Sequence, residues 1–145
     1  MKVIVQRVLK SSCTIDGQVV SKIDKGYMLL VGFGLNDTRE NVDKMVKKVS
    51  KLRIFEDENG KMNLDIHQVK GSVLSISQFT LLADPTSGNR PSFTEAMKGE
   101  ESTKLYDYFN EELRKEGLVV ETGVFGADMK IDLINDGPVT IILEN

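Results

Sequence analysis

The chain has 145 residues, of which 40% are hydrophobic, and a formal net charge of −3. This length corresponds to one ordinary domain, and the composition is that of a globular protein rather than a disordered or low-complexity one. An acidic balance gives no general attraction for nucleic acid, so any RNA contact requires a local basic patch.

Export, membrane insertion and metal binding are not expected. The longest apolar stretch, residues 27–35, is too short to span a membrane, and Lys2 and Arg7 interrupt the apolar start that a signal peptide needs. The single cysteine, Cys13, cannot form an internal disulfide, and no Cys/His cluster exists for zinc. We expect a cytoplasmic protein without a metal or other cofactor.

The first third of the chain reads as strands followed by a helix. Residues 1–15 and 18–23 are predicted strands joined by a tight turn at Asp16-Gly17, and residues 27–31 form an apolar run typical of a buried strand. A helix is predicted to begin with a capping box from Asp37 to Glu40. Its apolar face is opposite a stripe of lysines, which consists of Lys44, Lys47, Lys48 and Lys51.

The remainder alternates strands with helices. Predicted strands cover residues 53–55, 72–80, 129–134 and 139–143, the last two joined by a turn at 135–138. A short helix is predicted from Ser92 to Gly99 and a long one from Ser102 to Lys115. We therefore expect one mixed α/β domain over residues 1–145, with a mostly antiparallel, barrel-like sheet and two main helices.

Three segments are candidates for function. Ser77-Gln78-Phe79-Thr80 ends a predicted strand, where backbone N–H groups can stabilise a developing oxyanion, although an ordinary half-buried strand end has the same pattern. Residues 135–140 contain a proline between strands, for which a hairpin turn is the simplest interpretation. Phe125, flanked by glycines, could stack on a base or lie in the core.

Familiar catalytic motifs are absent. The sequence has no Gly-x-Ser-x-Gly elbow, no Walker loop and no His-Glu-x-x-His. Thr80 has no evident base to activate it, and the only histidine, His67, is interpreted as a surface or packing residue. Cys13 is interpreted as a buried, inert thiol. A hydrolase with this sequence would act without a catalytic triad.

Two motifs resemble the paired signature of the D-aminoacyl-tRNA deacylases: residues 77–81 (SQFTL) and residues 135–140 (NDGPVT). Shorter segments in the order and spacing of that family cover essentially the whole chain, namely residues 6–8, 53–55, 60–63, 90–93, 105–109 and 127–129. The resemblance implies a cytoplasmic homodimer that hydrolyses the ester between a D-amino acid, or glycine, and the 3′-terminal adenosine of tRNA. It implies neither a DNA partner nor a membrane.

The resemblance also implies roles for individual residues. The active site would lie at the dimer interface, where a cis Gly137-Pro138 segment from one subunit enters the pocket of the other and excludes L-residues. The other implied roles are Ser77 and Gln78 lining the ester, the Phe79 and Thr80 amides acting as oxyanion donors, Phe125 and Met129 contacting the terminal adenine, and Arg7 bracing the Gly-Pro segment.

Alternatives remain open at this point. A non-catalytic dimeric module that binds an RNA end or a protein would keep the pocket without hydrolysis, and a generic esterase would act on small esters without RNA. The lysine stripe is the best local candidate for contact with RNA phosphates, but an amphipathic helix carries such a solvated face without any partner.

Overall fold

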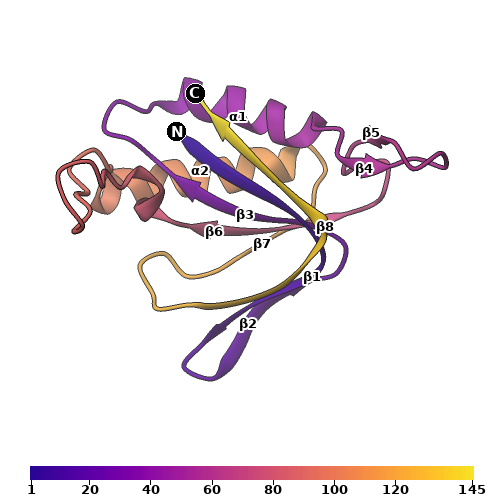
Figure 1. The fold of residues 1–145 in the computed structure, drawn as a ribbon, viewed down its shortest axis with the longest axis horizontal. Coiled ribbons are helices and arrows are strands. Elements are labelled where there is room, and N and C mark those ends of the chain that lie inside the picture. The colour runs from indigo at the N-terminus through magenta and orange to yellow at the C-terminus, as the bar shows by residue number, and fades with distance from the viewer.

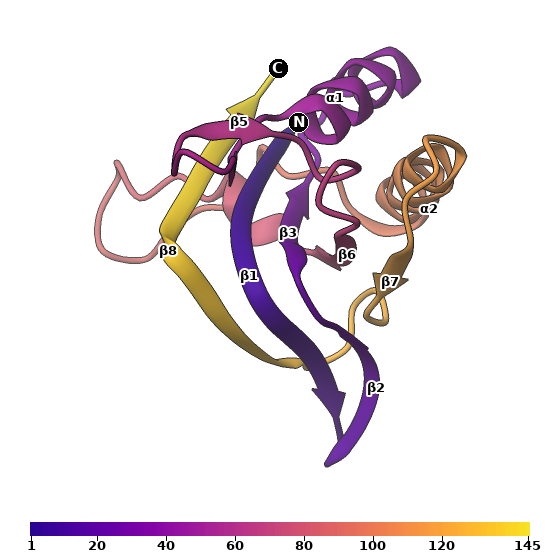
Figure 2. The same ribbon diagram turned by 90° about the vertical axis from the view of Figure 1, so that its right-hand side faces the viewer.

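A curved six-stranded sheet forms the body of the protein. The computed structural model describes all 145 residues, and Figures 1 and 2 show the sheet with both long helices on one side of it. The strands of the sheet are β1 (Lys2–Ile15), β2 (Gln18–Ile23), β3 (Gly26–Gly32), β6 (Ser72–Ser77), β7 (Val120–Thr122) and β8 (Lys130–Glu144).

Strand β1 organises the sheet, because it pairs antiparallel with β2, β3 and β8. Strand β6 instead pairs parallel with β3 and with β7. The predicted hairpin between β1 and β2 is confirmed, with positive φ angles of 49° at Asp16 and 75° at Gly17. The predicted fold class, a mixed α/β domain with a nearly barrel-shaped sheet and two main helices, is also confirmed.

The helices α1 (Arg39–Lys51) and α2 (Gly99–Lys115) cover the outer face of the sheet. Their apolar residues, among them Val46 and Phe109, join the main core with alternate residues of β1 and β3. The opposite face carries a smaller buried cluster that includes Cys13 and Ile76. Strand β3 is therefore buried on both sides, as its unbroken apolar run predicts.

The remaining elements are short. Strands β4 (Phe55–Glu56) and β5 (Met62–Leu64) form a small separate sheet around the predicted turn at residues 57–60. A 3₁₀ helix, η1 (Phe79–Leu82), follows β6 directly. The predicted strand 72–80 therefore ends at Ser77, three residues early, because the chain turns into η1. Neither α1 nor α2 combines the length and hydrophobicity that a membrane-spanning helix requires.

The start of α1 differs from the prediction. Thr38 is the N-cap. The backbone N–H of Thr38 donates a hydrogen bond to Asn41 Oδ1 at 2.9 Å, and the Thr38 hydroxyl donates to the same oxygen at 3.1 Å. Asp37 instead accepts hydrogen bonds from the Gly34 N–H at 2.6 Å and from the Met1 amino group at 2.8 Å. The predicted Asp37–Glu40 capping box was therefore wrong, because tertiary partners engage the Asp37 carboxylate.

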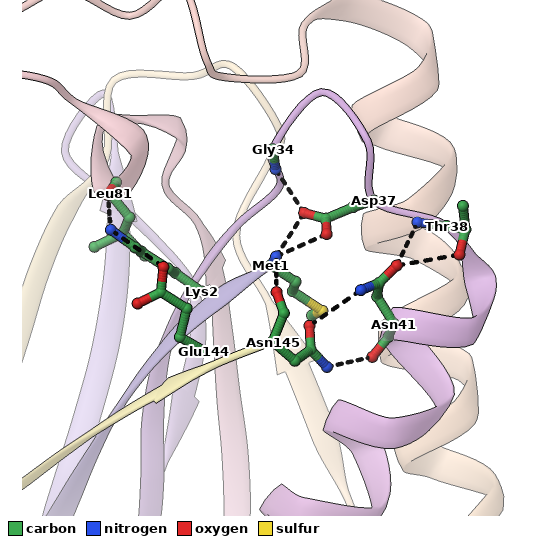
Figure 3. A network of polar contacts seen from close by, with 9 residues as sticks. All are labelled: Met1, Lys2, Gly34, Asp37, Thr38, Asn41, Leu81, Glu144 and Asn145. Carbon is green, nitrogen blue, oxygen red and sulfur yellow. Dashed lines mark hydrogen bonds and ion pairs between the residues drawn. The ribbon is translucent and has the colours of Figure 1, made fainter.

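Figure 3 shows how these contacts join the two ends of the chain. The Met1 amino group also donates to the Asn145 carbonyl at 3.0 Å, while the Asn145 side chain contacts Asn41. Nearby, the Lys2 ammonium lies 3.7 Å from the Glu144 carboxylate and donates to the Leu81 carbonyl at 3.5 Å. The starts of β1 and α1, the end of β8 and η1 are thus held together.

The predicted helix from Ser92 to Gly99 is wrong. Ser92 pairs in both directions with Asp84 through backbone hydrogen bonds of 2.8 Å, so the Ser92 side of the loop is extended. Gly99 does not end a helix but begins α2. The Ser92 and Glu95 spacing suits a capping box, but pairing across the loop competes with a helix over these residues.

The predicted hairpin turn at residues 135–138 is also wrong. Strand β8 is continuous from Lys130 to Glu144, and its two halves pair with the same strand β1. Between the pairs Gln6↔Thr140 and Val8↔Asn135, β8 has more residues than β1, so residues 136–139 bulge out of the ladder. Figure 2 shows the resulting bend in β8. The Gly137–Pro138 peptide bond in the bulge is cis.

Candidate active site

Two backbone donors lie at the start of η1. Gln78 has φ −148° and ψ 85°, so the backbone leaves the strand abruptly before the helix begins at Phe79. The first residues of such a helix have no partner inside it, and the N–H groups of Phe79 and Thr80 donate no hydrogen bond, whereas Leu81 N–H donates to the Gln78 carbonyl. These two N–H groups therefore have no hydrogen-bond partner within the chain.

A cavity of about 300 Å³ lies beside these donors. It brings together five of the residues implied by the family resemblance, Ser77, Gln78, Phe79, Phe125 and Met129. Thr80 does not line the cavity but follows Phe79 directly, and Arg7, Gly137 and Pro138 lie elsewhere. The remaining lining residues are Val31, Gly32, Phe33, Ile76, Ser102, Gly126, Ala127, Asp128 and Ile131.

Close packing of η1 on the end of β3 brings two segments that line the cavity together. A Cβ at Gly32 would lie 2.8 Å from the Gln78 carbonyl oxygen and 2.8 Å from Leu82 Cδ2. Since real Cβ atoms do not approach backbone this closely, only glycine lets η1 rest against the end of β3. The Gln78 N–H also donates to the Val31 carbonyl at 2.7 Å, which extends the β3–β6 pairing to the edge of the cavity.

Ser102 is a cavity residue that sequence reasoning missed. It lies in the first turns of α2 and is almost fully buried. In the sequence it marks the predicted start of a helix, so its residue type carries no separate signal for a binding site. Only the packing of α2 against the sheet places it beside the cavity.

No side-chain base serves the Thr80 hydroxyl. Its oxygen is hydrogen-bonded to the Gln78 side-chain amide, which is not a base. His67 lies at the other end of α2, where its Nε2 is 2.8 Å from the Glu116 carbonyl and its Nδ1 is 3.7 Å from Asp65. The interpretation of His67 as a surface or packing residue is therefore confirmed, since its side chain is exposed and bonded only to the chain beside it. Cys13 is fully buried, and burial raises the pKa of its thiol, in keeping with an inert residue.

The β8 bulge is held by its own side chains. Asn135 Oδ1 accepts from the Val139 N–H at 2.7 Å, and Asn135 Nδ2 donates to the Val139 carbonyl at 3.2 Å. One amide side chain thus replaces the strand partner that Val139 loses at the bulge. Gly137 and Pro138 between them are both exposed.

The buried Arg7 guanidinium fastens this bulge to the rest of the chain. Its Nε donates to the Asp136 carbonyl at 2.9 Å and its Nη1 to the Ile54 carbonyl at 2.8 Å. The carboxylates of Glu56 and Asp136, each 3.8 Å away, offset its buried charge. Gly137 and Pro138 are therefore fixed on both sides, by Arg7 at Asp136 and by Asn135 at Val139.

The bulge and the cavity lie apart within one chain. Arg7, which holds the bulge, is paired with Tyr27 near the start of β3, whereas Val31 and Gly32 at the end of β3 line the cavity. Four strand residues separate these places, which is roughly 13 Å along the strand. Gly137 and Pro138 are not among the residues that line the cavity of their own chain.

The fold and the site together define a small mixed α/β protein with a pocket at the end of β6, beside a hydroxyl that has no side-chain base. Comparison with known proteins points to one family. The family model described as D-Tyr-tRNA(Tyr) deacylase matches residues 4–144. The chain therefore belongs to the D-Tyr-tRNA deacylase family. Members of this family are hydrolases of aminoacyl-tRNA esters, so the chain is an enzyme of that class.

Individual members of the family are similar to the chain over nearly its whole length. The chain is 56% identical to a D-aminoacyl-tRNA deacylase of Lactobacillus delbrueckii subsp. bulgaricus, with 99% of each chain covered. It is 54% identical to one from Bacillus cytotoxicus, with 100% of this chain and 99% of the relative covered.

Solved structures show the same fold. One described as a c-Myc DNA Unwinding Element Binding Protein is 42% identical and has a TM-score of 0.94, with 100% of this chain and 99% of the other covered. A probable eukaryotic D-amino acid tRNA deacylase is 17% identical and has a TM-score of 0.84, with 98% and 97% covered, and this likeness concerns the fold alone.

Proposed function

We propose that the chain is a cytoplasmic homodimer that removes D-amino acids, and glycine, from tRNA. The observation that carries this proposal is the pair of free N–H groups at Phe79 and Thr80 beside a cavity with no side-chain base. An ester to tRNA is already an activated substrate, so oriented donors and a positioned nucleophile supply enough rate enhancement.

The reaction needs little from side chains. A water molecule, or the neighbouring ribose 2′-hydroxyl, attacks the ester carbon, and the carbonyl oxygen becomes an oxyanion held by the Phe79 and Thr80 N–H groups. The bond to the ribose 3′-oxygen then breaks, and that oxygen takes the proton which the attacking hydroxyl loses. If the 2′-hydroxyl attacks first, water hydrolyses the resulting ester in the same way. The Thr80 hydroxyl is not required.

The apolar part of the cavity suits the terminal adenosine. Phe125 and Met129 line it, and the Phe125 ring lies 6.0 Å from that of Tyr106, which limits its movement. An aromatic face offers a stacking platform that does not depend on the base sequence. We assign Phe125 and Met129 to the adenine and Ser77 and Gln78 to the aminoacyl ester.

A second copy of the chain would complete the site. Gly137 and Pro138 are exposed and lie away from their own cavity, so they can reach a cavity only in another subunit. In a symmetric dimer, each subunit would insert this gate into its partner. The main-chain carbonyls of the gate would leave room for the α-hydrogen of a D-residue and clash with the side chain of an L-residue, and glycine would pass because it has none.

Mixed dimers test both the reaction and the gate in trans. One chain carries Phe79→Pro, which damages the pocket, and the other carries Gly137→Ala, which damages the gate; two affinity tags isolate the mixed dimer. Each variant alone should hydrolyse D-tyrosyl-tRNA poorly. The mixed dimer retains one intact site of two, so its activity should recover to about half that of the wild type.

Other outcomes would overturn the proposal. A strict monomer, or a mixed dimer no more active than the single variants, would exclude the gate in trans. Binding of aminoacyl-tRNA without hydrolysis by the wild type would indicate a non-catalytic RNA-end-binding module. Hydrolysis of free amino-acid esters as fast as of aminoacyl-tRNA would indicate a generic esterase.

Arg7→Lys tests whether the guanidinium positions the gate. Lysine keeps the charge but cannot reach the Asp136 and Ile54 carbonyls in the same fixed geometry. Leaving a buried carbonyl unpaired costs about 1–3 kcal/mol, so the free energy of unfolding should fall by about that amount. Turnover of D-tyrosyl-tRNA should fall as well, at temperatures where the variant is fully folded. Wild-type turnover in the folded variant would exclude a positioning role.

A further inference from the structure

Four lysines gather at the C-terminal half of α1. They form a surface hollow of about 350 Å³, whose lining consists of Lys44, Lys47, Lys48, Lys51, Leu52 and Arg53. Among the lysines, only Lys44 has a carboxylate partner, Glu40 at 2.9 Å. All of the lysines are exposed, so the hollow presents uncompensated positive charge on a protein whose net charge is −3.

The structure of α1 does not by itself account for this charge. Cations in the last turn of a helix stabilise it through the helix dipole, but this applies only to Lys48 and Lys51. The nearby Asp43 is engaged elsewhere, since it accepts a hydrogen bond from the Tyr108 hydroxyl at 2.7 Å. A concave surface with several unpaired cations is suited to a polyanion such as the phosphate backbone of RNA.

The hollow lies at the same end of the molecule as the gate. Arg53 in its wall precedes Ile54, whose carbonyl accepts a hydrogen bond from Arg7, and Arg7 also holds Asp136 next to Gly137. Figure 1 shows α1 running toward β4 and β5, away from the end at which β3 finishes. The Leu52 carbonyl accepts from Tyr27 at the start of β3, whereas the cavity lies at its other end.

We propose that this hollow binds phosphates of the aminoacyl-tRNA whose 3′ end occupies the partner subunit's cavity. The inference rests on the proposed function, because it requires the gate to enter the partner. Each subunit would then give its partner's site a gate and a basic surface together, and the acceptor end of the tRNA would lie across both chains. Because the protein as a whole is negatively charged, tRNA would bind well only where its phosphates reach this basic hollow.

Neutralising the hollow tests the RNA contact. In Lys47→Gln/Lys51→Gln, the KM for D-tyrosyl-tRNA should rise at least about fivefold with little change in kcat. The salt dependence of log KM should flatten by up to about one unit of slope for each lost phosphate contact. The matched control, Lys104→Gln/Lys115→Gln, removes the same charge from α2, where each lysine pairs with a glutamate. It should leave both quantities unchanged.

Mixed dimers then locate the hollow relative to the active site. In the dimer with one working site, the Phe79→Pro chain supplies the gate and the Gly137→Ala chain supplies the cavity. Lysine substitutions on the chain that supplies the gate should raise KM, and the same substitutions on the other chain should not. The reverse result, or equal effects, would overturn the placement across the interface.

The two proposals fail in different ways. Unchanged KM and salt dependence in the homodimeric lysine variant, in an enzyme that remains active, would overturn the RNA contact alone. If the α2 control raised KM and flattened its salt dependence to the same extent, the effect would be one of general charge, and the RNA contact would also be overturned. Loss of complementation between Phe79→Pro and Gly137→Ala would instead overturn the gate in trans.

Discussion

Phe79→Pro should lower kcat for D-aminoacyl-tRNA by about 10²–10³-fold, the usual cost of losing one oxyanion donor. Proline lacks the backbone N–H that we assign to the oxyanion, and it fits the first position of a helix, where the N–H has no partner inside the helix. Gln78 before it has φ −148° and ψ 85°, outside the α-helical region that a following proline disfavours. The substitution therefore removes a donor with little change to the backbone.

Two matched variants separate the N–H from the side chains. Phe79→Ala keeps the N–H and removes a half-exposed ring, which packs edge-on against Phe93 with ring centroids 5.2 Å apart. The rate of hydrolysis should therefore fall about tenfold or less. Thr80→Ala also keeps its N–H and should retain substantial activity. Single-turnover rates on D-tyrosyl-tRNA at saturating enzyme give the comparison. Equal losses for Phe79→Ala and Phe79→Pro would exclude the Phe79 donor, and a loss of several orders of magnitude in Thr80→Ala would show that the hydroxyl acts.

Gly137→Ala should reduce turnover of D-tyrosyl-tRNA by about 10²-fold, because a displacement of about 1 Å in a positioning group has effects of this size. A Cβ at Gly137 would lie 2.7 Å from Val139 Cγ2, 2.9 Å from the Val139 nitrogen and 3.2 Å from Arg7 Nη2. The residue also has φ +139°, which L-residues rarely adopt. The gate must therefore move, and Arg7 and Asn135 hold the chain on either side of it.

A second glycine provides the control for backbone conformation. Gly88 has φ +136° in the exposed loop after η1, and a Cβ there would contact nothing within 4 Å. Gly88→Ala should thus lose stability without losing turnover or selectivity. Rates on D- and L-tyrosyl-tRNA are measured for both variants, together with thermal unfolding. Wild-type rates and selectivity in Gly137→Ala would contradict the role of this segment as the gate.

Local patterns in the sequence predicted most of the secondary structure. The turn at Asp16-Gly17, the buried β3 and the apolar faces of both helices follow from side-chain periodicity and turn chemistry, which act over a few residues. The errors arose where distant partners compete with local preferences. Asp37 has the spacing of a helix cap, but it binds Gly34 and the Met1 amino group instead.

For the site, the sequence by itself determined which chemical groups are present. It has one histidine that is not placed to act as a base, no nucleophile paired with a base, and two motifs shared with a deacylase family. The tertiary structure decided how those motifs are used. A proline between two strand patterns reads locally as a turn, yet both halves of β8 pair with β1, so residues 136–139 project from a continuous strand. Where that projection lies relative to the cavity depends on contacts between residues over a hundred positions apart, such as Arg7 and Asp136. No short-range pattern encodes such a distance, because it is set by how the whole sheet packs and curves.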